Sequence, residues 1–481
     1  MRCRFRSGAT SVREMFKGSF YMAEKEFITS GQQPDVPRSQ WSGKLAFILA
    51  GAASAVGLGN LWRFPTLAAK FGGGTFLLVY IIFAFTFGIS MLLLETSLGR
   101  KTGQSVIGAY SYFGKKYRFI GWLAVIVPFI ITPYYCIIGG WVARYTVGYV
   151  VDGTATLADG GAFFASFITS PTAAFAFMLI FMALTFLVVA MGVKGGIEKA
   201  NYVMMPALIV MALVIAIYIV MQPGAAEGAA YYLIPDFSKF SPELLIGAMG
   251  QMFYSLSLAM GIMVTYGSYL EKKESLTGSV ASIAGFDLLV SFLSGLMIVP
   301  VSFMVFGSAE EVMANSGPSL MFITLPQAFQ DMGAAGGVIG FVFFLLVLFA
   351  ALTSSISLTE ACVSIVQDGT HWTRRRSLIA TMIVIVVVGT VVCAGYNVLS
   401  FVQPLGDGST LLDFFDFISN SVIMPIVAFL TCFFVGWVIK PKTLIAEVRA
   451  SSRFRLAGAW TVMIKYIAPI LVVIILLANV L

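Results

Sequence analysis

Long apolar runs, separated by short polar segments, extend along almost the whole chain after residue 40. A membrane-spanning helix needs about 20 predominantly apolar residues, and eleven runs reach that length. Several runs exceed 25 residues, so these helices must tilt, bend or be interrupted. The eleven runs are residues 43–69, 74–98, 119–150, 171–191, 199–221, 243–270, 277–306, 336–367, 376–395, 409–438 and 457–480. The pattern predicts an all-α integral membrane protein with about 11 transmembrane helices.

Lysine and arginine are concentrated in every second polar segment. Residues 1–40 and the loops before residues 119 and 376 are strongly basic, whereas the alternate loops contain only Lys70 and Lys239. Cytoplasmic loops carry an excess of Lys and Arg, so we expect a multi-pass protein of the plasma (inner) membrane with a cytoplasmic N-terminal segment (1–40) and its C-terminus outside. Residues 1–40 contain no apolar core, so no cleavable signal peptide is expected.

Composition narrows the function classes. Only 11% of the residues are charged, compared with about 25% in soluble domains. The net charge of +7 lies in short blocks between apolar runs, which argues against nucleic-acid binding. The five cysteines form no CxxC pair, and His371 is the one histidine. A transition-metal centre or a Ser-His-Asp hydrolase site therefore has no basis in the sequence, and no enzyme activity is expected.

Two of the runs contain glycines and small polar residues near their centres. Glycine within a helix costs about 1 kcal/mol relative to alanine, and unpaired backbone in a membrane is tolerated only inside the protein or along a cavity. We therefore expect both helices to be broken, with free carbonyls and amides that can bind ions. Tight helix packing through small residues is the alternative explanation. The residues are Ser54, Gly57, Gly59 and Asn60 in the first run, and Ser255, Ser257 and Gly261 in the sixth.

The two interrupted runs are five spans apart, which is the spacing of two five-helix inverted repeats that meet at a midplane site. We predict a first repeat over residues 41–221, a second over 243–438, and an extra C-terminal helix over 457–480. The long outer loop 307–335 contains an apolar stretch too short to span. It is expected to form a helical hairpin in an outer vestibule, with a loop lying flat on the surface as the alternative.

Several motifs, in the same order, resemble those of the neurotransmitter:sodium symporter family and especially its bacterial amino-acid transporter branch. They are SAVGLGNLWRFP, GGGTFLLVYII, ETSLGR, YYCIIGGW, GQMFYSLSLAMG, GPSLMFITLP and FAALTSSISLTE, and the similarity covers roughly residues 38–440. The resemblance implies a leucine-transporter-like fold with a 5+5 inverted repeat whose helices 1 and 6 are broken at the midplane. It also implies sodium-coupled symport of an amino acid by alternating access, with sodium, the amino acid and the lipid bilayer as partners.

The resemblance further implies two sodium sites built from oxygen atoms, which suit a hard cation. Back-bonding of the hydroxyl groups within their own helix is the alternative for the second site. The first site would use the Ala55 carbonyl, Asn60, Ser255, Asp287 and the substrate carboxylate. The second would use the carbonyls of Ala53, Val56 and Ala350 with the hydroxyls of Thr353 and Ser354.

Gly57 indicates the class of substrate, because monoamine carriers of this family have an aspartate in this region. Without that carboxylate, the substrate is expected to bring its own, as an α-amino acid does. By resemblance, its carboxylate would meet the amides of Leu58 and Gly59 and the Tyr135 hydroxyl. Its amine would meet the carbonyls of Ala55, Tyr254 and Ser255 and the Ser257 hydroxyl. The side-chain pocket would consist of Ile131, Tyr135, Tyr254, Met260, Ser355 and Leu358. None of these residues is charged, and methionine packs well against rings, so a neutral, hydrophobic or aromatic amino acid is predicted.

Asp287 is an ionisable residue at membrane depth, where such groups are costly and need partners. Chloride-dependent relatives have asparagine at this position. We expect Asp287 to bind sodium and to replace the chloride charge, which makes transport chloride-independent; a structural aspartate satisfied by hydroxyls is the alternative. The residues that match the chloride ligands are Tyr80, Gln251, Ser255 and Ser291. Asp287 also keeps open a proton-coupled amino acid permease of the same fold. An ion channel is the alternative from another class, although no symmetric pore-loop repeat is visible.

The resemblance implies two gates. Arg63 and Asp416 would close the outer side above the substrate. At the cytoplasmic exit, Arg38 would pair with Asp368, supported by Trp41 and Tyr269. Such pairs must break once per cycle, so each is expected to be partly hydrated and individually weak. Ordinary surface pairing is the alternative.

Overall fold

The computed structural model describes residues 39–159, 161–307 and 318–480, and the regular structure in these residues is almost entirely helical. The exception is an isolated β-bridge between Gly73 and Pro235. Nine described segments are long and apolar enough to cross a membrane. They are Gly74–Thr102, with α4 (Gly74–Phe83) and α5 (Ile89–Thr102); Lys115–Val151, with α7 (Arg118–Val151); Pro171–Ala190 (α10); Val193–Val220, with α11 (Glu198–Val220); Leu276–Phe306 (α15); Ala334–Thr370 (α18); Arg374–Ala394 (α19); Leu411–Val438, with α20 (Leu411–Asp416) and α21 (Met424–Phe433); and Ala457–Val480, with α23 (Ala457–Val462) and α24 (Ala468–Val480).

The first and sixth of the eleven predicted spans are each divided between shorter helices. In the first, α2 (Lys44–Ala55) is followed by η1 (Gly59–Arg63) and α3 (Phe64–Lys70), and the chain bends by 53° at the break. Counting this bent pair as one span raises the number among the described residues to ten. The sixth consists of α13 (Pro242–Ser255) and α14 (Ile262–Ser268).

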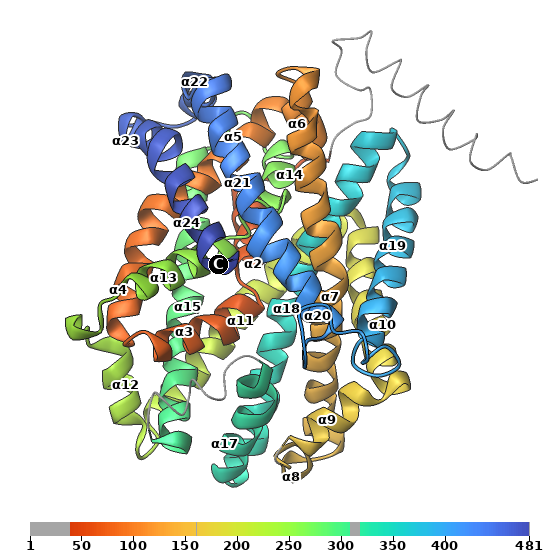
Figure 1. Ribbon diagram of the computed structural model, residues 1–481, viewed down its shortest axis with the longest axis vertical. Coiled ribbons are helices and arrows are strands. Elements are labelled where there is room, and N and C mark those ends of the chain that lie inside the picture. Colours follow the sequence, from red (N-terminus) through yellow and green to blue (C-terminus); the bar gives the residue numbers. More distant parts are fainter. Residues whose placement is uncertain (1–38, 160, 308–317, 481) are drawn as a thin grey trace, which may run out of the picture.

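Short helices connect the spans at both ends of the bundle (Figure 1). One end carries α6 (Val106–Ser111) and α22 (Lys442–Arg449). The opposite end carries α8 (Thr154–Leu157), α9 (Ala162–Thr169), α12 (Ala225–Leu233) and α17 (Leu325–Asp331).

The predicted hairpin region 307–335 is only partly within the described residues, since residues 308–317 lie outside them. The described remainder forms η6 (Leu320–Thr324) and α17, which packs on α18. Phe322 stacks on Phe164 with ring centroids 5.0 Å apart, and its carbonyl accepts a hydrogen bond from Tyr145 Oη at 2.6 Å. This segment is therefore packed into the bundle rather than laid flat on it.

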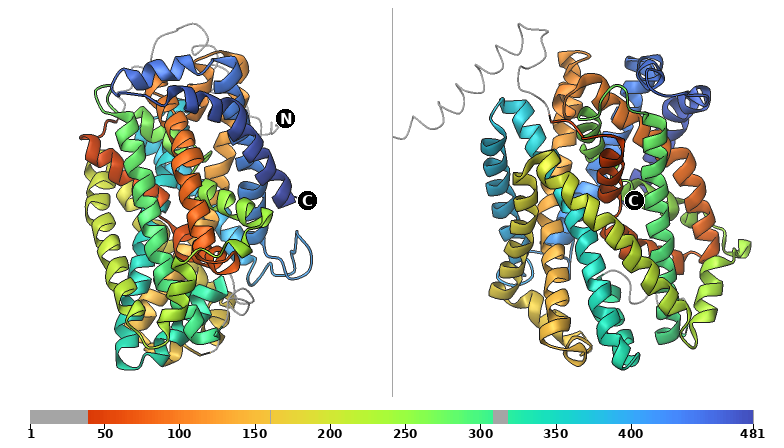
Figure 2. Two further views of the ribbon diagram at one scale, coloured as in Figure 1. Left: turned by 90° about the vertical axis from the view of Figure 1, so that its left-hand side faces the viewer. Right: turned by 180° about the vertical axis from the view of Figure 1, so that it is seen from behind.

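The helix α2 lies near the middle of the bundle (Figure 2) and packs against α11, α15 and α18. Every residue from Ala46 to Ala55 is buried, as expected for a helix that is apolar on all sides and enclosed by others. The break that follows Ala55 therefore opens into the interior of the protein rather than toward lipid.

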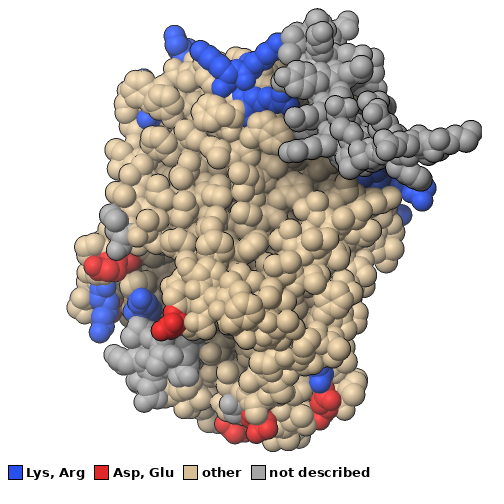
Figure 3. All heavy atoms as spheres, turned by 45° about the vertical axis from the view of Figure 1, so that its right-hand side comes forward, with Lys and Arg blue, Asp and Glu red and all other residues tan. Residues whose placement is uncertain are grey.

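Charged side chains are distributed unevenly along the bundle. On the face shown in Figure 3, Lys and Arg gather mainly at the end that carries α6 and α22, whereas Asp and Glu lie toward the opposite end. The broad middle zone between them is almost free of charge on this face, which is the surface a bilayer requires.

Candidate functional site

The break between α2 and η1 brings the chain against two other helices. Val56 leaves the helical region with φ −78° and ψ 106°, and the helix resumes at Gly59. At Gly57, an added Cβ would lie 2.7 Å from Ser354 Oγ on α18 and 2.9 Å from Tyr135 Oη on α7. Glycine alone permits this approach, which places backbone amides and carbonyls of the break between the helices.

The second break, residues 256–261, is held by side chains of neighbouring helices. Ser257 and Ala259 have φ of 52° and 60°, a left-handed conformation that costs a non-glycine residue roughly 1–3 kcal/mol. Glu95 Oε1 on α5 accepts the Ala259 N–H at 2.7 Å, and Ser257 Oγ donates to Ser54 O at 2.9 Å. These bonds hold the strained segment beside the first break.

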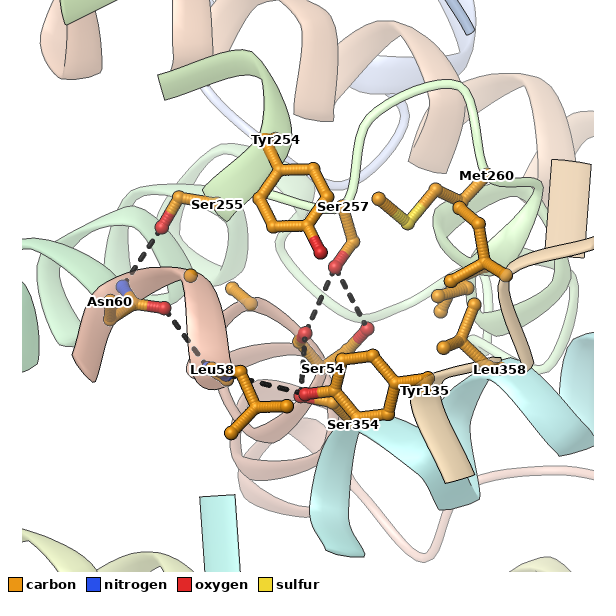
Figure 4. Close-up of a pocket in the computed structure, with 15 residues that line it drawn as sticks. Ser54, Leu58, Asn60, Tyr135, Tyr254, Ser255, Ser257, Met260, Ser354 and Leu358 are labelled. Atoms are coloured by element: carbon orange, nitrogen blue, oxygen red, sulfur yellow. Dashed lines mark hydrogen bonds between the residues drawn. The ribbon is translucent and has the colours of Figure 1, made fainter. Parts of the chain in front are cut away.

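A narrow cavity lies between the two breaks (Figure 4), and backbone and small residues of the breaks form much of its wall. The ring of Tyr254 lies across the cavity from that of Tyr135, whose hydroxyl accepts the Leu58 N–H at 3.3 Å. None of the lining residues is charged. They are Ser54, Ala55, Gly57, Leu58, Gly59, Asn60, Ile131, Tyr135, Tyr254, Ser255, Ser257, Met260, Ile262, Ser354 and Leu358.

A first cluster of buried oxygen atoms lies beside the cavity. Asn60 Nδ2 is 2.8 Å from Ser255 Oγ, 2.8 Å from Asp287 Oδ1 and 2.9 Å from Ser291 Oγ. Tyr80 Oη donates to the other carboxylate oxygen, Asp287 Oδ2, at 3.0 Å. The amide NH₂ thus lies where three oxygen atoms converge, a position that suits a cation. The amide oxygen of the same side chain, Asn60 Oδ1, accepts the Gly57 N–H at 3.0 Å and so ties the cluster to the first break.

A second cluster joins the end of α2 to α18. Ser354 Oγ lies 3.4 Å from Ala53 O and 3.1 Å from Val56 O. Thr353 Oγ1 donates to Ala350 O within its own helix at 3.0 Å. The donor set consists of neutral carbonyl and hydroxyl oxygens, which fits a hard monovalent cation. The structure also shows the helix back-bond of Thr353 that was the alternative explanation.

The sequence model of the Sodium:neurotransmitter symporter family matches residues 38–153 and 166–481, nearly the whole chain. The chain belongs to this family. The symporter is similar to the sodium-dependent transporter YhdH of Bacillus subtilis, with 36% identity over 91% of this chain and 97% of that protein. A sodium-dependent transporter of Haemophilus influenzae is 31% identical over 92% of this chain and 98% of that protein. A solved structure of MhsT in complex with L-phenylalanine matches with a TM-score of 0.81 and 34% identity, covering 92% of this chain and all of that one.

These similarities confirm the predicted family and the class of activity. The symporter is a multi-pass membrane protein that couples transport to sodium, and its relatives are transporters rather than enzymes. Several predicted binding residues lie together around one cavity in its interior, although they come from four separate stretches of the sequence.

Ser355 differs from the other residues predicted for the side-chain pocket, because it does not line the cavity. Its Oγ accepts a hydrogen bond from Thr185 Oγ1 on α10 at 3.1 Å and lies 3.5 Å from Cys136 Sγ on α7. Adjacent residues of a helix point in directions about 100° apart, so Ser354 faces the cavity and Ser355 packs behind its wall. Contact between Ser355 and the substrate stays a prediction, and in this arrangement Ser355 contacts Thr185 and Cys136 instead of the cavity.

Gln251 occupies a position between the break and the predicted chloride cluster. Its Nε2 donates to the Gly59 carbonyl at 2.9 Å, so it supports the start of η1. Tyr80 and Ser291, which also match chloride ligands, lie 3.4 Å apart beside the carboxylate of Asp287. The Asp287 carboxylate thus accepts a hydrogen bond from one of these hydroxyls and lies close to the other.

A larger cavity of about 270 Å³ lies on the other side of Tyr135 and Tyr254. Both predicted outer-gate residues, Arg63 and Asp416, line it. No salt bridge joins these two described residues: the Arg63 guanidinium lies over the Tyr254 ring, 5.5 Å from its centroid, and Asp416 Oδ1 accepts from Tyr134 Oη at 3.1 Å. The two aromatic rings, rather than an ion pair, separate the two cavities here.

The predicted inner gate is described only in part, because Arg38 lies outside the described residues. Trp41 Nε1 donates to Tyr266 O at 3.0 Å, and its ring meets that of Tyr269 with centroids 6.0 Å apart. Asp368 accepts the Ser105 N–H at 2.7 Å. Trp41 is 2% exposed, so its ring is packed inside the protein against Tyr266 and Tyr269.

An ion pair that the sequence analysis missed lies beside these rings. Glu360, which is fully buried, accepts hydrogen bonds from Tyr269 Oη at 2.8 Å and from Arg374 Nη2 at 2.5 Å. Arg374 also donates to Val189 O at 3.0 Å. The available signal was a carboxylate within the apolar run 336–367, because a charge at such a position needs a partner.

Proposed function

We propose that the symporter imports a neutral, hydrophobic or aromatic amino acid together with sodium by alternating access. The observation that carries this proposal is the uncharged cavity between two helix breaks. Broken helices offer amides to a carboxylate and carbonyls to an ammonium group, so a zwitterion needs no charged side chain. A charged substrate side chain would add a third charge to the carboxylate and the ammonium group, and no lining residue has the opposite charge to pair with it.

The proposed substrate lies with its carboxylate toward the first break. The amides of Leu58 and Gly59 and the Tyr135 hydroxyl would bind the carboxylate. The ammonium group would meet carbonyls of the two breaks, at Ala55, Tyr254 and Ser255, and the Ser257 hydroxyl. The filled space at Gly57 supports this orientation, since no side chain could stand there between Tyr135 and Ser354.

The side chain of the amino acid would then point toward Ile131, Met260 and Leu358. All three line the cavity and are apolar, and Met260 can adjust its shape to an aliphatic chain or a ring. The similarity to MhsT, whose solved complex contains L-phenylalanine, supports a substrate of this class.

Two sodium sites and a 5+5 inverted repeat complete the proposal. The first site is assigned to the cluster of Asn60, Ser255 and Asp287, and the second to the cluster around Thr353 and Ser354. The repeats are assigned to residues 41–221 and 243–438, with 457–480 as the extra C-terminal helix. Because each break contributes oxygens to a cluster, ion binding would bias the same segments that hold the substrate.

We propose that the carboxylate of Asp287 makes transport independent of chloride. Its carboxylate is fully buried and is surrounded by donors from Asn60, Ser255 and Tyr80. Those donors would otherwise suit a small anion. A bound sodium ion would neutralise the carboxylate, and a proton could do the same when sodium leaves. The proposal therefore includes the exchange of a proton on the return step of the transport cycle.

Closure of the outer side is assigned to Arg63 and Asp416, which face one cavity without pairing. The inner side is assigned to Trp41, Tyr269 and the Arg38–Asp368 pair. The basic end of the bundle (Figure 3) would be cytoplasmic, with the N-terminus inside and the C-terminus outside.

Uptake of labelled amino acids into proteoliposomes tests the proposal. An inward sodium gradient should drive uptake of phenylalanine or leucine, and replacing chloride by gluconate should leave it unchanged. Glutamate and lysine should not compete. Uptake that follows a pH gradient without sodium would favour the proton-coupled alternative, and uptake of glutamate or lysine would refute the assigned substrate class.

A further inference from the structure

A long apolar groove lies on the outer surface of the bundle, away from the transport cavity. One wall is the face of α7 that carries Phe119, Trp122, Ile126 and Ile130, and the other is α19 at Val384 and Val388. The groove has a volume of about 750 Å³. Phe119 is 51% exposed and Trp122 is 42% exposed, so large apolar side chains are left uncovered within the described structure.

The groove has the length of one leaflet of a bilayer. From Phe119 to Ile130, α7 rises by about 16 Å at 1.5 Å per residue. Half of the hydrocarbon core of a bilayer measures about 15 Å. Because Phe119 is in the first turn of α7, the groove begins at the basic end of the bundle and ends near its middle.

Basic side chains surround the end where the groove begins. Arg118 lies with its guanidinium 5.7 Å from the centroid of the Trp122 ring. Its Nε is shielded from solvent and has no hydrogen-bond partner among the described residues. Lys115 and Lys116, just before α7, are exposed. The mouth of the groove therefore offers unneutralised hydrogen-bond donors beside an apolar surface.

The wall of the groove that α19 forms also begins with basic residues. The helix α19, which packs on α7, starts at Arg374, and the next two residues, Arg375 and Arg376, are exposed. Neither residues 104–151 nor residues 369–406 include an aspartate or a glutamate. Arg374 is paired with Glu360, so the exposed positive charge beside the two walls comes from Lys115, Lys116, Arg375 and Arg376.

We propose that this groove is a binding site for an anionic phospholipid of the leaflet on the basic side of the protein. One acyl chain lies along the groove against Trp122 and Ile126, and the phosphate accepts hydrogen bonds from Arg118 and the neighbouring lysines. The ligand must be amphipathic, because the groove is apolar along its length and cationic at one end. It must be anionic, because the polar residues at the mouth of the groove are the cations Lys115, Lys116 and Arg118.

Native mass spectrometry of the delipidated full-length protein tests the charge requirement. Phosphatidylglycerol should bind more tightly than phosphatidylcholine with the same chains, and each basic residue removed at a membrane surface should weaken binding about fivefold. The variant Lys115→Ala/Lys116→Ala/Arg118→Ala should lose the preference. Arg453→Ala/Arg455→Ala removes exposed charges elsewhere and should keep it. Equal binding of the two lipids, or an equal loss in both variants, would overturn the proposal.

Fluorescence quenching tests the groove itself on the unaltered protein. Phosphatidylglycerol with brominated acyl chains should quench more strongly than brominated phosphatidylcholine at the same mole fraction, and this difference should disappear in Trp122→Phe. A difference that persists in Trp122→Phe would place the lipid elsewhere. A dimer that dissociates only in the groove variants would show that a second copy of the chain covers this face instead. Sodium-dependent uptake by each variant shows that it is folded.

Discussion

Glu95 Oε1 accepts the backbone N–H of Ala259 at 2.7 Å, and this bond ties α5 to the strained segment between α13 and α14. Glu95 is buried, and its other oxygen, Oε2, has no hydrogen-bond partner among the described residues. The neighbouring Ser257 contributes to the cavity wall. Glu95 therefore shapes the cavity from outside it, through one backbone amide.

Two substitutions of Glu95 distinguish the effect of its hydrogen-bond acceptor from the effect of its negative charge. Glu95→Gln retains an oxygen that can accept the Ala259 N–H, so substrate affinity should stay within about threefold of wild type. Glu95→Ala leaves a buried N–H unpaired at a cost of about 1–3 kcal/mol, which should weaken binding by roughly 5- to 150-fold. Equilibrium binding of labelled substrate at saturating sodium measures both. An equal loss in the two variants would show that the charge matters instead.

Neighbouring serines of α18 provide a matched pair for the second sodium site. Ser354→Ala removes one oxygen near the Ala53 and Val56 carbonyls, so the sodium concentration for half-maximal substrate binding should rise about tenfold, the effect of roughly 1.4 kcal/mol. Ser355→Ala removes a hydroxyl that bonds Thr185 behind the wall. It should lower the melting temperature and leave the sodium midpoint unchanged. A shifted midpoint in Ser355→Ala would contradict this assignment.

The sequence was sufficient for the family and for the place of most spans, because bilayer thickness fixes the length of an apolar run. Eleven spans were predicted, and the described residues contain nine segments of sufficient length and apolarity, or ten with the bent first span. The sequence was not sufficient for the direction of single side chains on a buried helix. Ser354 and Ser355 are alike in sequence, and only packing against α2, α7 and α10 determines which one faces the cavity. The sequence likewise contains Glu360 and Arg374, but it does not reveal that they pair, because their pairing depends on how α18 and α19 pack together.

The sequence predicts only part of the backbone conformation of the second break. Its glycine, Gly261, has φ of 75°, as a glycine in such a position often does. Ser257 and Ala259 adopt positive φ as well, and their residue types give no signal of it. Their conformation depends on partners far along the chain, Ser54 and Glu95, which a local pattern does not reveal.

Replacement of Asp287 tests whether its carboxylate stands in for an anion. Asp287→Asn removes the charge but leaves the donors of Tyr80 and Asn60 in place. We expect sodium-driven uptake to become chloride-dependent, with several-fold stimulation when gluconate is replaced by chloride. The double variant Asp287→Asn/Ser291→Ala removes one of those hydroxyls and should respond less to chloride. Uptake that is lost in both salts would assign Asp287 to sodium binding alone.

Glu447 anchors α22 to the bundle, since its Oε1 accepts from Arg100 Nε and Lys272 Nζ, both at 2.8 Å. Burial alone would raise the pKa of Glu447, but the hydrogen bonds and charges of Lys272 and Arg100 outweigh it and lower that pKa below its ordinary value of 4.5. A folded-state pKa that lies below the unfolded one stabilises the protein fully above the unfolded pKa. This contribution is lost as the pH falls through the folded pKa.

The variant Glu447→Gln should therefore lower the melting temperature at neutral pH, where the wild-type carboxylate is ionised and paired. As the pH falls below 4.5 and through the lowered pKa of the folded state, the wild type loses that advantage and the two melting temperatures should converge. Glu271→Gln is the matched control, because Glu271 pairs with the exposed Lys273 at 2.6 Å and exposed pairs contribute little. A melting temperature that falls as far in Glu271→Gln as in Glu447→Gln would mean that general surface charge, rather than the anchoring of α22 to Arg100, sets this stability.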